Sequence, residues 1–443
     1  MTTHKGFKRL VRERMARTGE RYSTARRALL PHETTAGLTD DAGPGGVSPG
    51  IHPDTAALAS VLARRLVSPL SGAPLSEAMI LGIGGGLGAG YILWEFKAHG
   101  SPIITLGFRN QWQYPAIPGW LGKTLDRLAI PAELHETGGA VRARQTLDRL
   151  LAGGDPAIAF IDQQSIGTWG QPDSLAGRSG YPVVVTGRTA DGAYLIDDRS
   201  RQPLVVPASV LATARGRIGS FKHRLIVPRP AAGGIAGDTL RSAIQDGLSD
   251  QVDHLRSSSD SFSLPTWRKW SRLLTDTRNA KAWPRVFADG RGLLGALLSI
   301  IEAVDDDIGA YGGNLRDLYA DFLDEATTAL DRPALAEAAN RWRAIADLWR
   351  DLADAAIPVW LPGASEAVEA AEDLRAAVSD GEPGRGRADS AARALWAIRE
   401  RPDGGALSAD SRAELFAELG QRIGAIYAAE KDALEATAAA SGR

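Results

Sequence analysis

The sequence contains no cysteine among its 443 residues. This absence excludes disulfide bonds, zinc sites with cysteine ligands, iron–sulfur clusters and a thiol nucleophile, and it fits a reducing cytoplasm. Long apolar runs are also lacking. The longest uncharged run, residues 78–94, has 17 residues of which six are glycine, too short and too flexible for a membrane helix. The first residues show no apolar core of a secretion signal, so we expect a cytoplasmic protein with no membrane segment.

Positive charge is concentrated at the start of the chain. Residues 1–30 contain nine Lys or Arg and two Glu, a net charge of +7, so that residues 31–443 carry −9 and the whole chain −2. Apolar spacing predicts short helices in this basic N-terminal appendage. Two interpretations remain open: a solvated helical arm, or a docking element in residues 5–30 for an anionic partner such as RNA or an acidic protein face.

Composition divides the rest of the chain into three parts. Residues 31–50 are polar and rich in Gly and Pro, which is typical of a linker. Residues 51–230 mix helical spacing with short β-rich runs, predicting an α+β domain with mostly antiparallel strands. Residues 238–440 read as an all-helical domain, interrupted by a surface loop at 381–387. The predicted strands are 78–81, 103–108, 157–161, 183–186, 194–196, 204–206 and 221–227.

Three stretches of the sequence carry a family resemblance. The first is IHPDTAAL at 51–58 followed by LGIGGGLGAGY at 81–91. The second is GYPVVVTG at 180–187 leading to YLIDD at 194–198, and the third combines LPTWRKW at 264–270 with GGNLRDLYADFLDEA at 312–326. In this order and spacing they resemble the butirosin biosynthesis protein H family, an N-terminal domain with an accompanying helical domain of unassigned function.

The resemblance implies a papain-like N-terminal domain and an acyltransferase site. In the family, a Cys preceded by His opens the first helix as nucleophile, a His at the start of a later strand is the base, and an Asp after the next strand orients that base. The characterised member moves an acyl group from a carrier-protein thioester onto an aminoglycoside amine. The matching positions here are His52, Pro53, Tyr181 and Asp197 or Asp198.

Both reactive side chains of the family are therefore replaced. Pro53 stands where the Cys belongs and offers no nucleophile, and Tyr181 stands where the base His belongs. A tyrosine hydroxyl, with an ordinary pKa near 10, is a poor proton acceptor at neutral pH. Thr55 is a candidate substitute nucleophile on the same helix as Ser60, with helix capping as its alternative role.

Two further segments are candidate ligand-binding elements. Gly84-x-Gly86-x-x-Ala89 loosely matches a dinucleotide fingerprint, which requires a preceding strand and a following helix. The resemblance instead makes this a loop beside the site, with Gly85 and Gly86 as candidate binding residues together with Tyr181. The aromatic segment 111–120, including Trp112 and Tyr114, predicts the wall of a ligand cleft, with a loop packed on the core as the alternative.

The sequence predicts no metal and no cofactor. The histidines lack metal-ligand spacing, and the acidic residues of 317–325 favour a solvated helix face over a cation site. We favour a non-catalytic binding or scaffolding role in specialised metabolism, with an acyl carrier protein, a peptide or a small amine as partner. The alternative is an acyltransferase that moves an acyl group from a carrier-protein thioester to an amine without a Cys nucleophile. The oligomeric state stays open.

Overall fold

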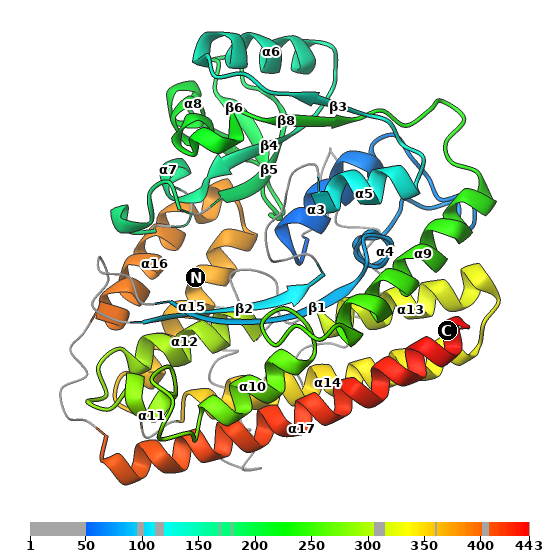
Figure 1. Ribbon diagram of the computed structural model, residues 1–443. Helices are drawn as coiled ribbons and strands as arrows, with labels where there is room; N and C mark the ends of the chain where they lie inside the picture. The colour runs from blue at the N-terminus through cyan, green and yellow to red at the C-terminus, as the bar shows by residue number, and fades with distance from the viewer. Residues whose placement is uncertain are drawn as a thin grey trace, which may run out of the picture.

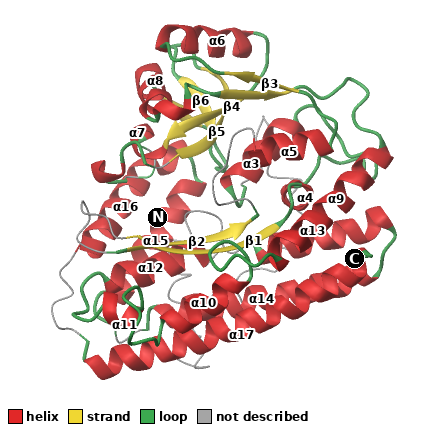
Figure 2. Ribbon diagram, viewed as in Figure 1, coloured by secondary structure: helices red, strands yellow, loops and turns green. Residues whose placement is uncertain are grey.

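The computed structural model of the chain describes residues 50–94, 102–110, 119–167, 169, 171–178, 180–304, 315–358, 361–400 and 407–442. The basic appendage, nearly all of the linker, Trp112 and Tyr114 lie outside these residues. Figure 1 shows the strands of a sheet-containing N-terminal half above a layer of long helices, and Figure 2 shows how completely helices dominate the C-terminal half. The predicted α+β domain followed by an all-helical region is confirmed.

The N-terminal half is built on a six-stranded antiparallel sheet with strand order β3-β8-β4-β5-β6-β7. Alternate residues of β4 and β5 face opposite sides, as strand geometry requires. One side packs against α6 and α8, and the other packs against α3. The strands of this sheet are β3 (Ala132–His135), β4 (Ala157–Asp162), β5 (Gly180–Arg188), β6 (Tyr194–Asp197), β7 (Leu204–Val206) and β8 (Leu225–Pro228).

Six α-helices accompany the strands among the described residues of this half. The first, α3, carries the family's first motif and packs on β5. The others connect the strands or cover their faces. Their bounds are α3 (Pro53–Ala63), α4 (Glu77–Ile83), α5 (Gly119–Arg127), α6 (Ala140–Ala152), α7 (Gln163–Ile166) and α8 (Ala208–Arg217).

The described residues of the C-terminal half form α-helices and one short 3-10 helix joined by loops, as the all-helical prediction for this region expects. No helix of the described chain is long and apolar enough to cross a bilayer. The helices are α9 (Gly237–Arg256), α10 (Pro265–Leu273), α11 (Trp283–Val286), α12 (Leu293–Val304), α13 (Arg316–Leu330), α14 (Ala334–Ala356), α15 (Ala364–Ser379), α16 (Arg385–Glu400) and α17 (Ala409–Ser441).

The strand predicted at 78–81 is wrong. These residues lie in α4, which Ser76 caps by accepting a hydrogen bond from the Met79 N–H at 2.9 Å. Every residue from Ala78 to Ile83 is buried, so the continuous apolar run reflects burial on all sides and not a strand period. The chain then forms β1 (Leu87–Trp94), which pairs with β2 (Ile103–Arg109) as a separate antiparallel hairpin.

The glycine-rich segment after α4 serves close packing. It follows a helix and precedes a strand, the reverse of the order that a dinucleotide fingerprint requires. A Cβ at Gly82 would lie 2.2 Å from the Phe322 ring, and one at Gly86 would lie 2.7 Å from the Tyr319 ring. Gly85 and Gly86 also adopt positive φ angles of 103° and 63°. These glycines let α4 and β1 approach the helical half.

The segment predicted as a surface loop at 381–387 is instead a short 3-10 helix, Glu382–Gly384, followed by the start of α16, and it is only partly exposed. Gly381 is buried, and a Cβ there would lie 1.9 Å from the Gln202 carbonyl oxygen. Glu382 accepts a hydrogen bond from the Val205 N–H at 2.8 Å, and Arg385 donates to the Val205 carbonyl at 2.7 Å. The segment thus supplies hydrogen-bond partners for the backbone N–H and carbonyl of Val205 at the free edge of β7, and it links the sheet to the helical half.

A buried ion pair anchors the β1–β2 hairpin on the helices. Arg316 at the start of α13 and Glu430 on α17 have no exposed surface, and two of their N–O pairs lie 2.9 Å apart. Glu430 also accepts hydrogen bonds from indole N–H groups of α10 and α14. Arg316 in turn donates to the carbonyls of Gly88 and Phe108, one on each strand of the hairpin. The main hydrophobic core surrounds this pair and is continuous across both halves.

We expect Arg316→Met to lower the free energy of unfolding by about 3–5 kcal/mol, because it leaves the Glu430 carboxylate buried without its cation. Urea unfolding followed by circular dichroism measures this loss. The double variant Arg316→Met/Glu430→Gln should lose less than the two single variants combined. Arg341→Ala, which removes an exposed ion pair with Glu337, is the control and should cost at most about 1 kcal/mol. If Arg316→Met and Arg341→Ala lowered the free energy of unfolding by the same amount, the anchoring role of Arg316 would be contradicted.

Candidate functional site

The N-terminus of α3 is held by polar contacts from two directions. The His52 ring caps the helix by accepting a hydrogen bond from the Asp54 N–H through Nδ1 at 3.3 Å, and Pro53 occupies the first turn, where no N–H is needed. The Glu77 carboxylate on α4 accepts hydrogen bonds from the backbone N–H groups of Ile51 and His52, both at 2.8 Å. Burial raises the pKa of Glu77. These contacts fix where the helix begins.

The His52 ring is neutral. Burial and the nearby Arg109 guanidinium lower the pKa of His52 to about 3, although Asp54 opposes the shift. Arg109 lies at the end of β2 and forms an ion pair with Asp54 at 2.8 Å. A neutral ring whose Nδ1 accepts a hydrogen bond carries its proton on Nε2. His52 is therefore not charged at neutral pH.

Tyr181, at the start of β5, belongs to a buried polar network. Its hydroxyl donates a hydrogen bond to the Asp198 carboxylate at 2.7 Å and accepts one from the Arg199 guanidinium at 2.9 Å. The Trp169 indole N–H donates to the other Asp198 oxygen at 3.0 Å. Burial raises the pKa of the Tyr181 hydroxyl well above its ordinary value. The hydroxyl is thus a fixed structural group.

Arg199 connects this network to α3. It adopts a φ of 57°, in the left-handed region that residues with a side chain seldom use. Its guanidinium donates to the Ile51 carbonyl at 2.8 Å, just before α3. No motif in the sequence points to Arg199 or Trp169 as site residues. The only sequence signal for Arg199 is its place directly after the matched Asp pair.

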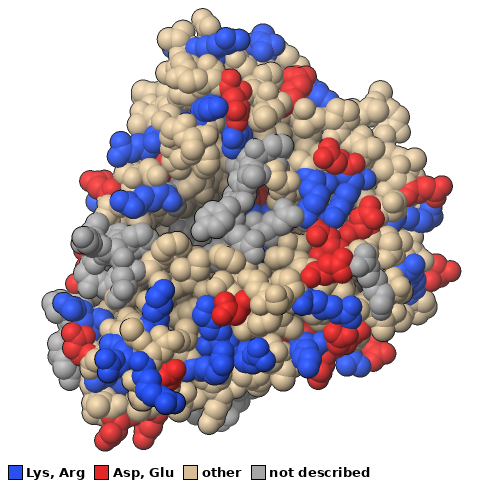
Figure 3. Space-filling model, viewed as in Figure 1, with Lys and Arg blue, Asp and Glu red and all other residues tan. Residues whose placement is uncertain are grey.

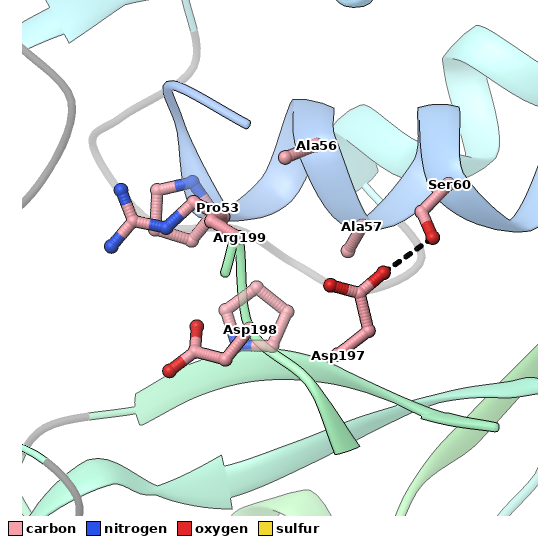
Figure 4. A pocket seen from close by; sticks show the side chains of 8 residues that line it. Pro53, Ala56, Ala57, Ser60, Asp197, Asp198 and Arg199 are labelled. Atoms are coloured by element: carbon pink, nitrogen blue, oxygen red, sulfur yellow. Dashed lines mark hydrogen bonds between the residues drawn. The ribbon is translucent and has the colours of Figure 1, made fainter. Parts of the chain in front are cut away.

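A small pocket lies between α3 and the ends of β5 and β6, with room for about one water molecule. The Ser60 hydroxyl donates to the Asp197 carboxylate at 2.6 Å across it, as Figure 4 shows. The lining residues are Pro53, Ala56, Ala57, Ser60, Pro182, Asp197, Asp198 and Arg199. Three of the positions matched by the family resemblance, Pro53, Asp197 and Asp198, therefore line one pocket. The other two form hydrogen bonds to residues that line it: Tyr181 bonds to Asp198 and Arg199, and the His52 carbonyl accepts from the Ala56 N–H.

The Asp197 carboxyl of this pocket has a raised pKa. Burial raises its pKa to about 6, and the nearby Asp198 carboxylate adds to the rise, whereas the Ser60 hydrogen bond and Arg64 oppose it. At neutral pH most of the Asp197 side chains are ionised, so the pocket then carries a carboxylate.

The remaining candidate residues lie elsewhere. Thr55 is fully buried, and its hydroxyl donates to the Glu77 carboxylate at 2.6 Å, so it does not line the pocket. Gly85 and Gly86 pack beneath α9 and α13 and also lie away from the pocket lining. Among the described residues, no three His, Asp or Glu side chains come together in a way that could hold a metal ion. The acidic face of α13 meets arginines of α14, with Asp321 bound to Arg343 at 2.9 Å.

We expect the stability contributed by Asp197 to fall as the pH rises. The folded protein keeps a proton on this carboxyl up to about pH 6, whereas the unfolded chain releases it near its ordinary value of 3.8. The stabilising contribution of the protonated Asp197 carboxyl is therefore complete below about pH 3.8 and is lost as the pH rises through about 6. Asp197→Asn cannot ionise, so it should gain about 2–3 kcal/mol over the wild type between about pH 4 and about pH 7.5. Urea unfolding at both pH values measures the gain.

The control for this experiment is Asp246→Asn, at an exposed position of α9. It should show no comparable gain over the wild type between the two pH values. Equal pH dependence in the two variants would contradict the assignment to Asp197.

The comparisons with known families agree with the geometry. Residues 52–199 match the family described as butirosin biosynthesis protein H, N-terminal, and residues 240–383 match a domain of unknown function, DUF4872. No curated protein matches the chain. The first match begins at His52 and ends at Arg199, so both of its ends lie at the site. The protein is a member of the butirosin biosynthesis protein H-like family, with a papain-like N-terminal domain followed by the family's additional helical domain.

Proposed function

We propose that this protein is a non-catalytic binding protein, a relative of butirosin biosynthesis protein H that keeps the family's cleft without its thiol and imidazole. The observation that carries this proposal is the Tyr181 hydroxyl, which is tied between Asp198 and Arg199. The hydroxyl at the position of the base donates a hydrogen bond to a carboxylate and accepts hydrogen bonds from a guanidinium group. It therefore has no basic lone pair to offer a substrate.

The position of the nucleophile supports the same conclusion. Pro53 lines the pocket with a saturated ring, and the hydroxyl of Thr55 is donated to Glu77 within the protein. His52 is neutral with Nδ1 committed to capping α3. Activation of a nucleophile needs an adjacent base or a lowered pKa. The Glu77 carboxylate lies beside the Thr55 hydroxyl, but Thr55 has no exposed surface, so this hydroxyl is not presented to a substrate.

The pocket itself suits the end of a small cationic ligand. Pro53, Ala56, Ala57 and Pro182 form apolar walls, and the Asp197 and Asp198 carboxylates supply negative charge. The guanidinium of Arg199, which also lines the pocket, donates hydrogen bonds to Ile51 and Tyr181. An ammonium group entering here would exchange water for a charge-assisted hydrogen bond to Asp197. Because the pocket is small, only such a terminal group would enter it. We propose a small amine, or a carrier protein or peptide that presents one, as the bound partner.

We expect the purified chain to keep its unmodified mass after incubation with small acyl thioesters, with no acylated amine above the uncatalysed background. Intact-protein mass spectrometry and chromatography of the amines measure both outcomes. A covalent adduct, or product that disappears in His52→Ala or Tyr181→Phe, would overturn the non-catalytic assignment. Tyr181→Phe is a conservative test because it removes only the hydroxyl.

A double variant tests whether the family's frame survives. In Pro53→Cys/Tyr181→His the new thiol lies at the start of α3 near Arg109 and Arg199, and helix termini and cations lower a thiol pKa. We expect iodoacetamide to alkylate it with an apparent pKa below the ordinary value of about 8.5. Because the wild type has no cysteine, each variant carries a single thiol. Ser257→Cys, at the exposed end of α9, is the control, and equal reactivity of the two thiols would contradict a preserved frame.

A second candidate function is acyl transfer by a changed mechanism. The Ser60–Asp197 pair lines the pocket, and burial raises the pKa of that carboxyl to about 6, in a useful range for a base. In this case the protein would hold a thioester and an amine close together without a Cys intermediate. Acylated amine formed by the wild type and lost in Asp197→Asn, with no covalent adduct, distinguishes this candidate from the binding protein.

A further inference from the structure

The helical half carries a concentrated basic surface. Between positions 268 and 291 the chain has seven Lys or Arg and two Asp, a net charge of +5, within a protein whose total is −2. These residues belong to α10, α11 and the loops that follow them. Figure 3 shows Lys and Arg gathered at the lower left of this face, where Figure 1 places α10 and α11.

Five cations of this stretch are exposed and form no direct salt bridge with any residue that the structure describes. Backbone hydrogen bonds, and after them the charges of Arg278 and Arg272, lower the pKa of the nearby Asp276. The two remaining cations, Lys269 and Arg291, lie near Asp260 and Asp289. We define the basic surface as Arg268, Arg272, Arg278, Lys281 and Arg285.

Many arginines elsewhere on the helical half form ion pairs with carboxylates. On α14, Arg341 binds Glu337, and Arg343 binds Asp321 of α13. The single acidic side chain within the basic surface, Asp276, accepts hydrogen bonds from the backbone N–H groups of Arg278 and Asn279 and so caps a turn. The surface thus keeps most of its positive charge available to a partner.

The basic surface is mounted on a rigid base. Trp267, Trp270, Trp283 and Phe287 from the same segment are fully buried and pack in edge or tilted contacts within the core. The cations alternate with these anchors along the chain. Because the backbone is fixed by the core, a partner would meet a preformed arrangement of charge and would pay little to order the loop.

We propose that the basic surface docks an acidic face of a partner protein. This interaction surface is separate from the pocket and does not depend on the function proposed for it. Complementary charge of this kind speeds association and fixes the orientation of the complex. A compact acidic surface matches five cations grouped on two short helices and one loop.

Two observations favour a protein over a nucleic acid. Residues 31–443 carry a net charge of −9, so the body as a whole repels an extended polyanion. The large aromatic rings of the segment are buried, so they provide no platform for stacking bases. A local acidic patch can contact the basic surface without meeting the rest of the negative body.

The test compares two charge-reversal variants of the full-length chain by fluorescence anisotropy. The probe is a labelled helical peptide of about twenty residues, half of them glutamate. In the first variant Arg272, Lys281 and Arg285 are replaced by Glu, and in the matched control Arg241, Arg341 and Arg393 are replaced by Glu. The control has the same change in net charge at exposed arginines that are already ion-paired. Thermal unfolding establishes that both variants are folded.

We expect the wild type and the control to bind the peptide, with affinity that falls as NaCl rises from about 50 mM to about 200 mM. The first variant should bind at least about tenfold more weakly, a loss of one electrostatic docking site. An equal loss in the control would overturn the proposal, since only total charge would then matter. Absence of peptide binding to the wild type, or tighter binding of a single-stranded RNA of equal charge, would also overturn it.

Discussion

The buried Arg316–Glu430 pair is the constraint on which the arrangement of the two halves depends. Both side chains are fully buried. Glu430 accepts hydrogen bonds from two indole N–H groups, and Arg316 donates to one carbonyl on each strand of the hairpin. Such a pair tolerates little displacement, because a buried charge that loses its partner is costly. The β1–β2 hairpin is therefore fixed on the helices, although it belongs in sequence to the N-terminal domain.

This constraint extends to the site. The end of β2 carries Arg109, which binds Asp54 in the first turn of α3 and lowers the pKa of His52. On the other side, Arg199 holds the residue before α3 through the Ile51 carbonyl. The helical half thus supports the start of α3 through the hairpin, and the sheet supports it directly. Arg109 and Arg199 therefore lie on either side of the N-terminus of α3. Cations and a helix N-terminus are the environment that stabilises a thiolate, but proline occupies this position.

The polar side chains at the positions that match the family's site form hydrogen bonds within the protein. A tyrosine at the position of the base keeps the carboxylate partner and donates a hydrogen bond to it, as an imidazole N–H would. Unlike an imidazole, it has no second nitrogen to accept a proton from a substrate. The burial that would tune an acid or base now stabilises a closed network of Tyr181, Asp198, Arg199 and Trp169. Asp197 and Ser60 are left as the polar pair that faces the pocket.

The sequence by itself determined the helices of the C-terminal half, most strands of the sheet, and the replacement of the family's Cys and His at Pro53 and Tyr181. These follow from local periodicity and from single positions. It misread residues 78–81 as a strand because a run that is buried on every side has no period to read. Only the tertiary structure decided that the glycines serve close packing, that Thr55 points to Glu77, and that Ser60 meets Asp197 across 137 positions of sequence. Contacts of that kind depend on how the helix and sheet pack, and no local pattern encodes them.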